Sequence, residues 1–325
     1  MNRVLSLLLA ISCAALAGAP AHSQSSYPNR PVRMLVAFPP GGSSDVIARN
    51  ISPLLSERLG KPFVVEYRPG ASGAIAAQVT AKAPPDGHIL MIAGTSTVMG
   101  LNSVLIPDLP YDPKELAPIT LLVTTPFVVA VNPSMLPVGS VKDLLALLKA
   151  KPQPVSFGSG GNFSGMHLAG EYFKKIFGLD IQHVGYKGNG PALTDVAGGQ
   201  IPMAFVDLGS VGPFMKSGRV KILAVAAKQR SALAADIPTT AEAGLPVWEA
   251  LGSFGLFTTA GTPPDTINRV AAEVGRILRL PDIRERILVT GSEPAPTTPD
   301  EFTGFINSEV AKWVRVIRES GIKLE

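Results

Sequence analysis

The sequence predicts an α/β fold of two lobes, each a mixed, mainly parallel sheet flanked by helices. Short apolar runs typical of buried strands alternate with segments of helical periodicity, as in doubly wound sheets. Two of these units open with a strand and a glycine-rich turn, one early in the chain and one near its middle. About 300 residues follow the N-terminal segment, which is enough for two domains.

The N-terminal segment, residues 1–23, predicts a secretory signal peptide. A positive start at Asn2-Arg3 precedes an apolar run from Val4 to Ala17, and Ala19-Pro20-Ala21 supplies small residues for a signal peptidase. The apolar run is shorter than the ~20 residues that span a bilayer. We therefore expect an exported, periplasmic protein that is cleaved near Ala21 or Ser23.

Composition excludes several other classes of protein. The chain is 46% hydrophobic and 17% charged, which is typical of a globular protein. Its net charge is only +4 with 6% aromatic residues, whereas nucleic-acid binding favours a concentrated basic face with aromatic platforms. The one cysteine, Cys13, lies in the signal peptide, and the histidines are too widely spaced for a metal motif. A lipid attachment at Cys13 is a poorer fit than simple cleavage. We expect no metal or cofactor.

The first lobe is predicted from apolar runs and from the turns that end them. Val32 to Phe38 is a buried-strand pattern that stops at Pro39-Pro40, and the next helix places Ile47 and Ile51 on one face. The same logic predicts strands at 32–38, 63–66 and 88–93, with helices at 45–59 and 74–83.

The second lobe follows the same alternation. Two strands, 119–123 and 127–131, are expected on either side of Thr124-Thr125-Pro126, and Ser140 with Asp143 forms a capping box for a helix. Further strands are predicted at 155–157, 181–184, 203–206 and 220–226, with helices ending near Phe177 and following Pro191. Two more helices follow, one after Thr262-Pro263 and the last over 299–320.

The chain is expected to cross between the lobes twice. It would leave the first lobe near Ile119 to Val131 and return near Val220 to Ala226. The first lobe would then comprise residues 27–124 and 227–325, and the second 125–226. The two crossing segments are the expected hinge.

Three glycine-rich turns lie between a strand and a helix: Gly41-Gly42-Ser43-Ser44, Gly70-Ala71-Ser72-Gly73 and Gly158-Ser159-Gly160-Gly161. In an open α/β sheet, such turns lie at the carboxyl ends of the strands, which is the edge where ligands bind. Glycine admits a ligand close to the backbone, and the free N–H groups and dipole of a helix start favour an anion. Each turn alone is compatible with an ordinary tight connection. Together they indicate a shared anion site.

The sequence contains no complete nucleotide-binding motif. The turn at Gly158 has Phe163 where the dinucleotide fingerprint requires glycine, and no glycine turn continues into Lys-Ser or Lys-Thr. Gly70-Ala71-Ser72-Gly73-Ala74 resembles a nucleophile elbow that ends in alanine. A secreted serine hydrolase that uses Ser72 is therefore the alternative function, and it would need His88, His167 or His183 as its base.

Three polar side chains near the turns have more than one possible role. Asp45 is placed to cap its helix or to face a ligand, and capping is favoured. His167 is a cap, a core residue or a ligand contact, with a structural role favoured. Asp207 ends an apolar strand and could point into a cleft between the lobes.

These segments resemble the Bug family, the substrate-binding receptors of tripartite tricarboxylate transporters. The resemblance runs from about Tyr27 to the C-terminus. The matching segments are Pro39 to Asp45 with Ala48-Arg49, Val65 to Gly73, Pro85-Asp86-Gly87, Gly158 to Asn162 with Ser164 and His167, Val184 to Gly188, Leu223-Ala224-Val225, and Glu242-Ala243-Gly244.

The resemblance implies a monomeric, non-catalytic periplasmic binding protein of the Venus-flytrap type (type II-like). Such a receptor closes on a small carboxylate and delivers it to membrane transporter subunits, with backbone amides and water holding the ligand. The expected ligand contacts are Phe38, Pro40, Gly41, Gly42, Ser43, Asp45, Ala71, Ser72, Gly73, Thr95, Ser96, Ser159, Gly160, Asn162, Phe163, Ser164, His167, Tyr186 and Asp207.

Two residues depart from the family pattern. Tyr67 stands where the family usually has asparagine, and Phe163 stands where it often has glycine. If Phe163 faces the cleft rather than the core, it supplies an apolar wall and fills volume. We then expect a preference for a compact monocarboxylate or dicarboxylate, or a flat aromatic acid, over citrate.

Overall fold

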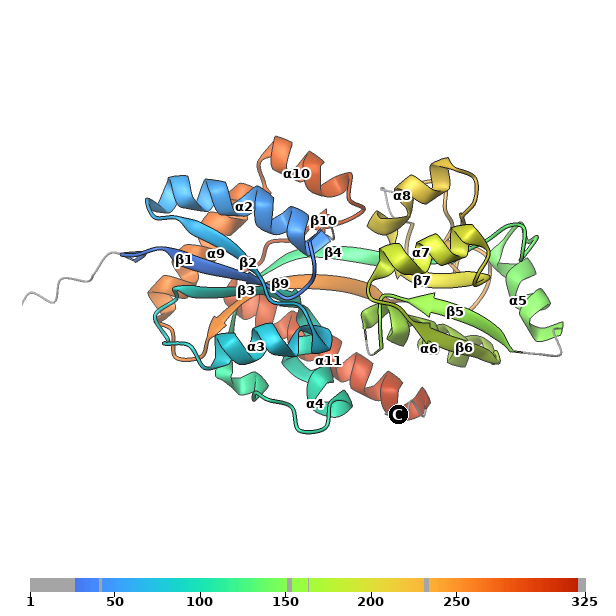
Figure 1. The fold of residues 1–325 in the computed structure, drawn as a ribbon, viewed down its shortest axis with the longest axis horizontal. Coiled ribbons are helices and arrows are strands. Elements are labelled where there is room, and N and C mark those ends of the chain that lie inside the picture. The colour runs from blue at the N-terminus through green and yellow to red at the C-terminus, as the bar shows by residue number, and fades with distance from the viewer. Residues whose placement is uncertain (1–26, 41–42, 151–153, 163, 231–233, 321–325) are drawn as a thin grey trace, which may run out of the picture.

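A computed structural model of the 325-residue chain describes residues 27–40, 43–150, 154–162, 164–230 and 234–320. Within these residues, ten strands form one mixed sheet in the order β2-β1-β3-β9-β4-β7-β5-β6, with β8 and β10 joined to β4. Figure 1 shows the two lobes side by side, with β4 and β9 running from one into the other. The expected two-lobed α/β fold is confirmed.

The first lobe is built on a parallel core of three strands. β1 pairs with β2 on one side and with β3 on the other, and β9 adds to β3 in antiparallel orientation. Buried apolar clusters cover both faces of this sheet. Its strands are β1 (Val32–Val36), β2 (Phe63–Tyr67), β3 (Ile89–Gly94), β9 (Leu251–Thr259) and β10 (Glu293–Pro294), and its helices are α2 (Ser43–Leu59), α3 (Ala74–Ala81), α4 (Asn102–Leu105), α9 (Pro264–Leu278) and α10 (Pro281–Leu288).

The second lobe repeats the arrangement around an aromatic core. β5 pairs in parallel with β6 and β7. The rings of Phe173 and Phe205 lie 5.1 and 5.5 Å from that of Trp248, which is fully buried. The strands are β5 (Val155–Ser159), β6 (Ile181–Gly185), β7 (Met203–Asp207) and β8 (Lys221–Val225), and the helices are α5 (Val141–Ala150), α6 (Gly165–Phe177), α7 (Asn189–Gly198) and α8 (Leu208–Lys216).

The two strands expected around Thr124-Thr125-Pro126 form one continuous strand, β4 (Leu116–Val131). That part of the prediction is wrong. β4 pairs with β9 as far as Pro126, and from Phe127 onward it pairs with β7. Proline lacks an N–H and usually interrupts a sheet. Pro126 stands where β4 changes its pairing partner, so the absence of its N–H removes few hydrogen bonds from the sheet.

The return from the second lobe also differs from expectation. β8 pairs with β4 only over Val128–Val131, the part of β4 that also pairs with β7 of the second lobe. The chain returns instead along β9, which pairs with both β3 and β4. Between β8 and β9, Ala234, Ile237 and Trp248 pack in the cores of the second lobe.

The last helix, α11 (Pro299–Ser320), has the predicted bounds and crosses both lobes. Phe302 and Ile306 pack in the first-lobe core, whereas Trp313 and Ile317 pack in the second-lobe core. Figure 1 shows α11 in red, passing beneath both parts of the sheet. Among the described residues, no helix combines the length and apolar character needed to cross a membrane.

The Ser140 side-chain cap predicted for α5 is present, but Asp143 bonds back to the Ser140 hydroxyl and the Gly139 N–H and not to the Ser140 N–H of a capping box. Ser140 Oγ accepts a hydrogen bond from the Asp143 N–H at 3.2 Å and donates to Asp143 Oδ2 at 2.9 Å. We expect Ser140→Ala to lower the free energy of unfolding by about 1 kcal/mol, because a helix N–H loses its acceptor. Urea unfolding measures this. The exposed Lys142→Ala in the same turn is the control, and equal midpoints for the two variants would contradict a stabilising cap.

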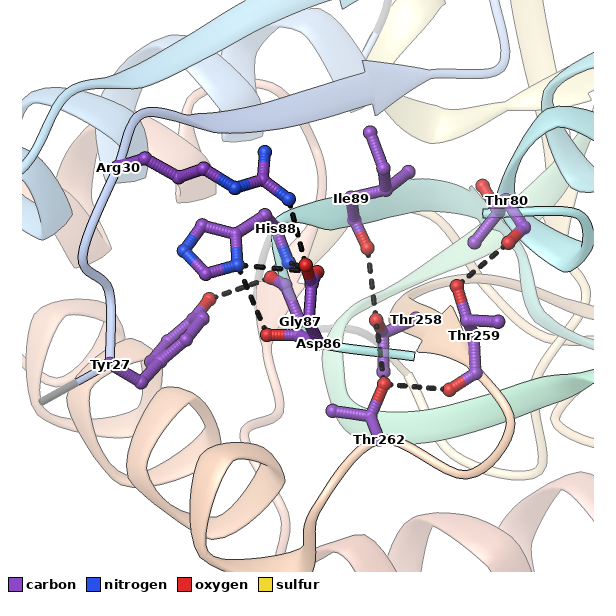
Figure 2. Close-up of polar contacts among 10 residues, drawn as sticks. All are labelled: Tyr27, Arg30, Thr80, Asp86, Gly87, His88, Ile89, Thr258, Thr259 and Thr262. Carbon is purple, nitrogen blue, oxygen red and sulfur yellow. Dashed lines mark hydrogen bonds and ion pairs between the residues drawn. The ribbon is translucent and has the colours of Figure 1, made fainter. Parts of the chain in front are cut away.

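The amino end of β3, opposite the predicted ligand edge, is closed by hydrogen bonds (Figure 2). Tyr27 donates its hydroxyl to the Gly87 carbonyl at 2.8 Å, and Arg30 pairs with Asp86 at 2.7 Å. His88 Nδ1 lies 3.1 Å from the Asp86 carbonyl oxygen. Burial raises the pKa of Tyr27, so its hydroxyl stays protonated and continues to donate. These contacts hold the start of the strand in place.

Candidate ligand-binding site

The carboxyl ends of the parallel strands in the two lobes face each other. Ser72 follows β2 in the first lobe, and Asn162 follows β5 in the second. Ser72 Oγ donates a long, weak hydrogen bond of 3.4 Å to the Asn162 carbonyl oxygen. One predicted glycine turn therefore contacts the residue that directly follows another, across the two lobes.

The lobes also touch through backbone at the start of α8. Gly209 in α8 lies against the carbonyl group of Thr290, in the loop that follows α10. A Cβ atom built on Gly209 would overlap that carbonyl oxygen, and one on Gly291 would overlap the Gly209 backbone. Only residues without a side chain permit this approach. Nearby, Thr125 Oγ1 and Ser292 Oγ are 2.7 Å apart.

The first-lobe edge of the candidate site begins where β1 leads into α2. This helix starts at Ser43, two residues earlier than predicted, so Ser43 and Ser44 lie in its first turn. Asp45 is 6% exposed, and its Oδ1 accepts hydrogen bonds from Arg49 Nε at 2.7 Å and from the Tyr67 hydroxyl. Arg49 also donates to the Tyr67 oxygen at 2.9 Å. The hydrogen bond to Asp45 raises the pKa of Tyr67. Tyr67, where the family usually has asparagine, thus completes an Asp45–Arg49–Tyr67 network.

The turn after β2 has an unusual backbone. Gly70 and Gly73 have φ values of +127° and +88°, and Ala71 and Ser72 have +45° and +51°. Non-glycine residues rarely adopt such values, and each costs about 1–3 kcal/mol. Asn102 Nδ2 donates to the Ser72 carbonyl at 3.4 Å from behind the turn. The strained turn directs Ser72 toward the second lobe.

The end of β3 contributes Thr95 and Ser96. Thr95 is 1% exposed, and within the described part of the chain its Oγ1 has no hydrogen-bond partner. A buried hydroxyl without a partner costs about 1–3 kcal/mol. An acceptor or donor that reached this atom would recover that free energy.

At the second-lobe edge of the candidate site, two histidines support the loop after β5. His183 Nε2 lies 2.7 Å from Ser159 Oγ, and the His167 ring stacks on His183 with centroids 3.7 Å apart. Burial lowers the pKa of His167 to about 3 and that of His183 to about 4, so both rings are neutral at pH 7. Ser164 Oγ caps α6 by accepting from the His167 N–H at 3.2 Å. His167 is thus buried against His183, and its structural role stays a prediction. His183 was named from the sequence as a possible base for the hydrolase and not as a ligand contact.

Asp207 ends β7 and caps α8. Its Oδ1 accepts from the Ser210 N–H and from Ser210 Oγ, both at 2.8 Å, and its Oδ2 accepts from Asn189 Nδ2. Burial raises the pKa of Asp207. Sequence reasoning missed Asn189, although it follows Gly188 at the carboxyl end of β6, where a ligand-facing residue could be sought.

Other predicted contacts lie around these groups. Tyr186 donates its hydroxyl to Asp195 Oδ2 at 2.8 Å, within the second lobe. Phe38 packs edge-on against Phe254, with ring centroids 5.6 Å apart, and Pro40 is exposed. Gly41, Gly42 and Phe163 lie outside the described residues.

The arrangement gives no support to the serine hydrolase. His88 lies at the opposite end of β3, bonded to Asp86, and His183 is bonded to Ser159. Ser72 is bonded instead to a carbonyl oxygen. The described residues also contain no group of three or more histidine, cysteine or acidic side chains that could hold a metal ion.

Comparison with known proteins decides between a receptor and an enzyme. Residues 47–322 match the model of the tripartite tricarboxylate transporter family receptor. The chain belongs to this family. The tripartite tricarboxylate transporter receptors bind solutes in the periplasm and are not enzymes, so the expected class of protein and the Bug-family resemblance are confirmed.

Relatives of this receptor include proteins with known ligands. BugT of Bordetella pertussis is 35% identical over 326 residues, covering 100% of this chain and 99% of BugT. The structure of Rpa4515 from Rhodopseudomonas palustris with adipate is 32% identical, with a TM-score of 0.85 over 91% of this chain and 99% of that one. MatC from the same organism, with bound malate, is 28% identical, with a TM-score of 0.80 over 90% and 100% of the two chains.

Proposed function

We propose that this receptor closes its two lobes around a small organic carboxylate and delivers it to the membrane subunits of a tripartite transporter. The observation that carries the proposal is the meeting of the glycine-rich edges, in which Ser72 of one lobe bonds to Asn162 of the other. The relatives with adipate and malate support a carboxylate as the ligand class.

The first lobe supplies neutral donors suited to a carboxylate. The α2 helix starts at the edge with Ser43 and Ser44 in its first turn, and its free N–H groups and dipole favour an anion there. The nearby guanidinium of Arg49 is already engaged by Asp45 and Tyr67. Recognition by backbone and hydroxyl groups favours a small anion that fits between the lobes.

Lobe closure would bend the two strands that cross between the lobes. β4 and β9 pair side by side over Leu116–Pro126 and carry the chain both ways. We therefore place the hinge at β4 and β9, and the packing of Trp248 supports assigning residues 227–250 to the second lobe. The N-terminal segment supports export and cleavage near Ala21 or Ser23, and we propose that the receptor acts as a monomer.

Thermal unfolding of the mature protein against a library of carboxylates tests the function. A ligand at 100 times its Kd should stabilise the receptor by about 2.7 kcal/mol. Ester hydrolysis is measured in parallel for wild type and for Ser72→Ala. Stabilisation without hydrolysis is expected. Hydrolysis that Ser72→Ala abolishes, with no carboxylate raising the melting temperature, would overturn the proposal.

A further inference from the structure

The strained turn after β2 is supported from behind by a buried asparagine. Ala71 and Ser72 both have positive φ values, so the turn needs contacts that keep it from relaxing. Asn102, at the start of α4, is fully buried, and its Nδ2 donates to the Ser72 carbonyl oxygen at 3.4 Å. Val98 packs behind the same turn, where a Cβ atom on Gly73 would lie 3.3 Å from Val98 Cγ1. One short segment of the first lobe therefore supports the whole turn.

The Asn102 amide has only one orientation that suits its neighbours. The Ser72 carbonyl oxygen accepts and does not donate, so the Nδ2 group must lie toward it. Nδ2 also donates to the Tyr111 hydroxyl oxygen at 3.2 Å, and that hydroxyl donates to the Val98 carbonyl at 2.8 Å. Burial raises the pKa of Tyr111 to about 12, so the hydroxyl stays protonated and continues to donate at neutral pH. Tyr111 thus fixes both Asn102 and the backbone at Val98.

The segment that carries Asn102 is itself closely packed. A π-helical turn, Thr97–Leu101, follows the end of β3 and leads directly into α4. Such turns are rare and occur frequently at functional sites. Leu101 is buried in the same apolar cluster as Trp313 of α11, and a Cβ atom on Gly100 would overlap Val310 of that helix. The Asn102 amide therefore reaches the turn from a support that is fixed against α11.

Asn102 is poorly suited to a role in stability alone. Its Oδ1 is buried, and within the described part of the chain this oxygen has no hydrogen-bond partner. A buried acceptor without a partner destabilises the folded state, which offsets the hydrogen bonds that Nδ2 makes. Asparagine therefore adds little net free energy of folding at this position. What its amide contributes is the conformation of the turn.

We propose that Asn102 is a positioning residue, which keeps the turn at 71–73 in the conformation that binds the carboxylate and does not touch the ligand itself. This inference rests on the proposed function. Without the Asn102 amide, Ala71 and Ser72 lose a contact that opposes their relaxation to negative φ values. A receptor in which only about a tenth of the molecules keep the turn binds about tenfold more weakly. Asn102→Ala is therefore expected to lower carboxylate affinity roughly tenfold.

Isothermal titration of the mature receptor tests the proposal with adipate, malate and the member of the carboxylate library that stabilises the wild type most. Asn132→Ala is the matched control. Asn132 is also buried, but it follows the end of β4 that pairs with the first residue of β7, away from the ligand edge, and both ends of its amide are bonded. This control should lower the midpoint of urea unfolding and keep the wild-type affinity. Equal affinities of Asn102→Ala and wild type, or equal losses in both variants, would overturn the inference while leaving a carboxylate receptor intact. Binding of no carboxylate by the wild type would overturn the proposed function as well.

Two further variants locate the effect in the turn. Tyr111→Phe keeps the ring but removes the oxygen that accepts from Asn102, so it should weaken binding in the same direction. Ala71→Gly removes strain from the turn, because glycine adopts positive φ values freely. In an Ala71→Gly background, Asn102→Ala should therefore lower affinity only about threefold. A loss of about tenfold in both backgrounds, or wild-type affinity in Tyr111→Phe, would contradict the assignment.

Discussion

Gly209→Ala is expected to weaken carboxylate binding roughly 100-fold, equivalent to about 2.7 kcal/mol, while leaving each lobe folded. In the structure, the new methyl group would overlap the Thr290 carbonyl oxygen, which comes from the other lobe. A backbone carbonyl cannot swing aside as the tip of a flexible side chain can. The lobes must therefore separate at this point, and the Ser72–Asn162 contact separates with them.

Calorimetry measures the loss of carboxylate affinity, and small-angle scattering measures whether the lobes still close. The variant should remain extended at ligand concentrations that make the wild type compact. Gly212→Ala is a close control, because it lies on the same helix and its Cβ would have no neighbour within 4 Å among the described residues. If both variants bind as the wild type does, the contact at Gly209 is not required for closure.

Acidification from pH 7 to pH 5 is expected to remove up to about 4 kcal/mol from the free energy of unfolding through His167 and His183. Their pKa values of about 3 and about 4 in the folded protein lie below the ordinary value of about 6.5 in the unfolded chain. Below pH 6.5 the unfolded chain therefore binds protons that the folded protein excludes. The free energy of unfolding is unaffected by these rings above pH 6.5 and decreases as the pH falls toward 4 for His183 and toward 3 for His167. At pH 5 the loss is roughly 2 kcal/mol for His167 and less for His183, whose partial exposure lets solvent screen its charge.

Urea unfolding at several pH values tests this dependence. His183→Gln keeps a polar side chain near Ser159 but does not titrate, so it should remove up to half of the change between pH 7 and pH 5. Gln182→Ala, an exposed neighbour on β6, should retain the full change. A His183→Gln variant as sensitive to pH as the wild type would show that other groups govern acid stability.

Most of the elements could be predicted because local patterns agree with the final packing. The Ser140 cap of the Asp143 N–H and the apolar face of α11 both have their expected partners. β9 was missed because Gly252 and Gly255 break its strand pattern. A Cβ on Gly252 would lie 2.8 Å from the Phe127 ring, and one on Gly255 would overlap Phe302. These glycines are explained by distant aromatic rings, which one strand's own sequence does not reveal.

The site residues also fall into those that the sequence predicts and those that it does not. Ser72 lies in a predicted glycine turn and Asn162 directly follows another, and the structure brings the two residues together. Asn189, and the contact of His183 with the loop after β5, were missed because their partners, Asp207 and Ser159, are 18 and 24 residues away along the chain. The order β7-β5-β6 brings them together, and strand order is a property of the whole sheet.

Among the described residues, β4 and α11 belong to both lobes, and β9 carries the chain back from the second lobe into the first-lobe sheet. Neither lobe can therefore complete its sheet or cover its core when the other is missing. The unfolding of one lobe therefore exposes the core of the other, and heat or urea is expected to unfold both lobes in one cooperative transition. The bending needed for ligand capture is thus built into a single folding unit, so a substitution that loosens one lobe lowers the stability of the whole receptor.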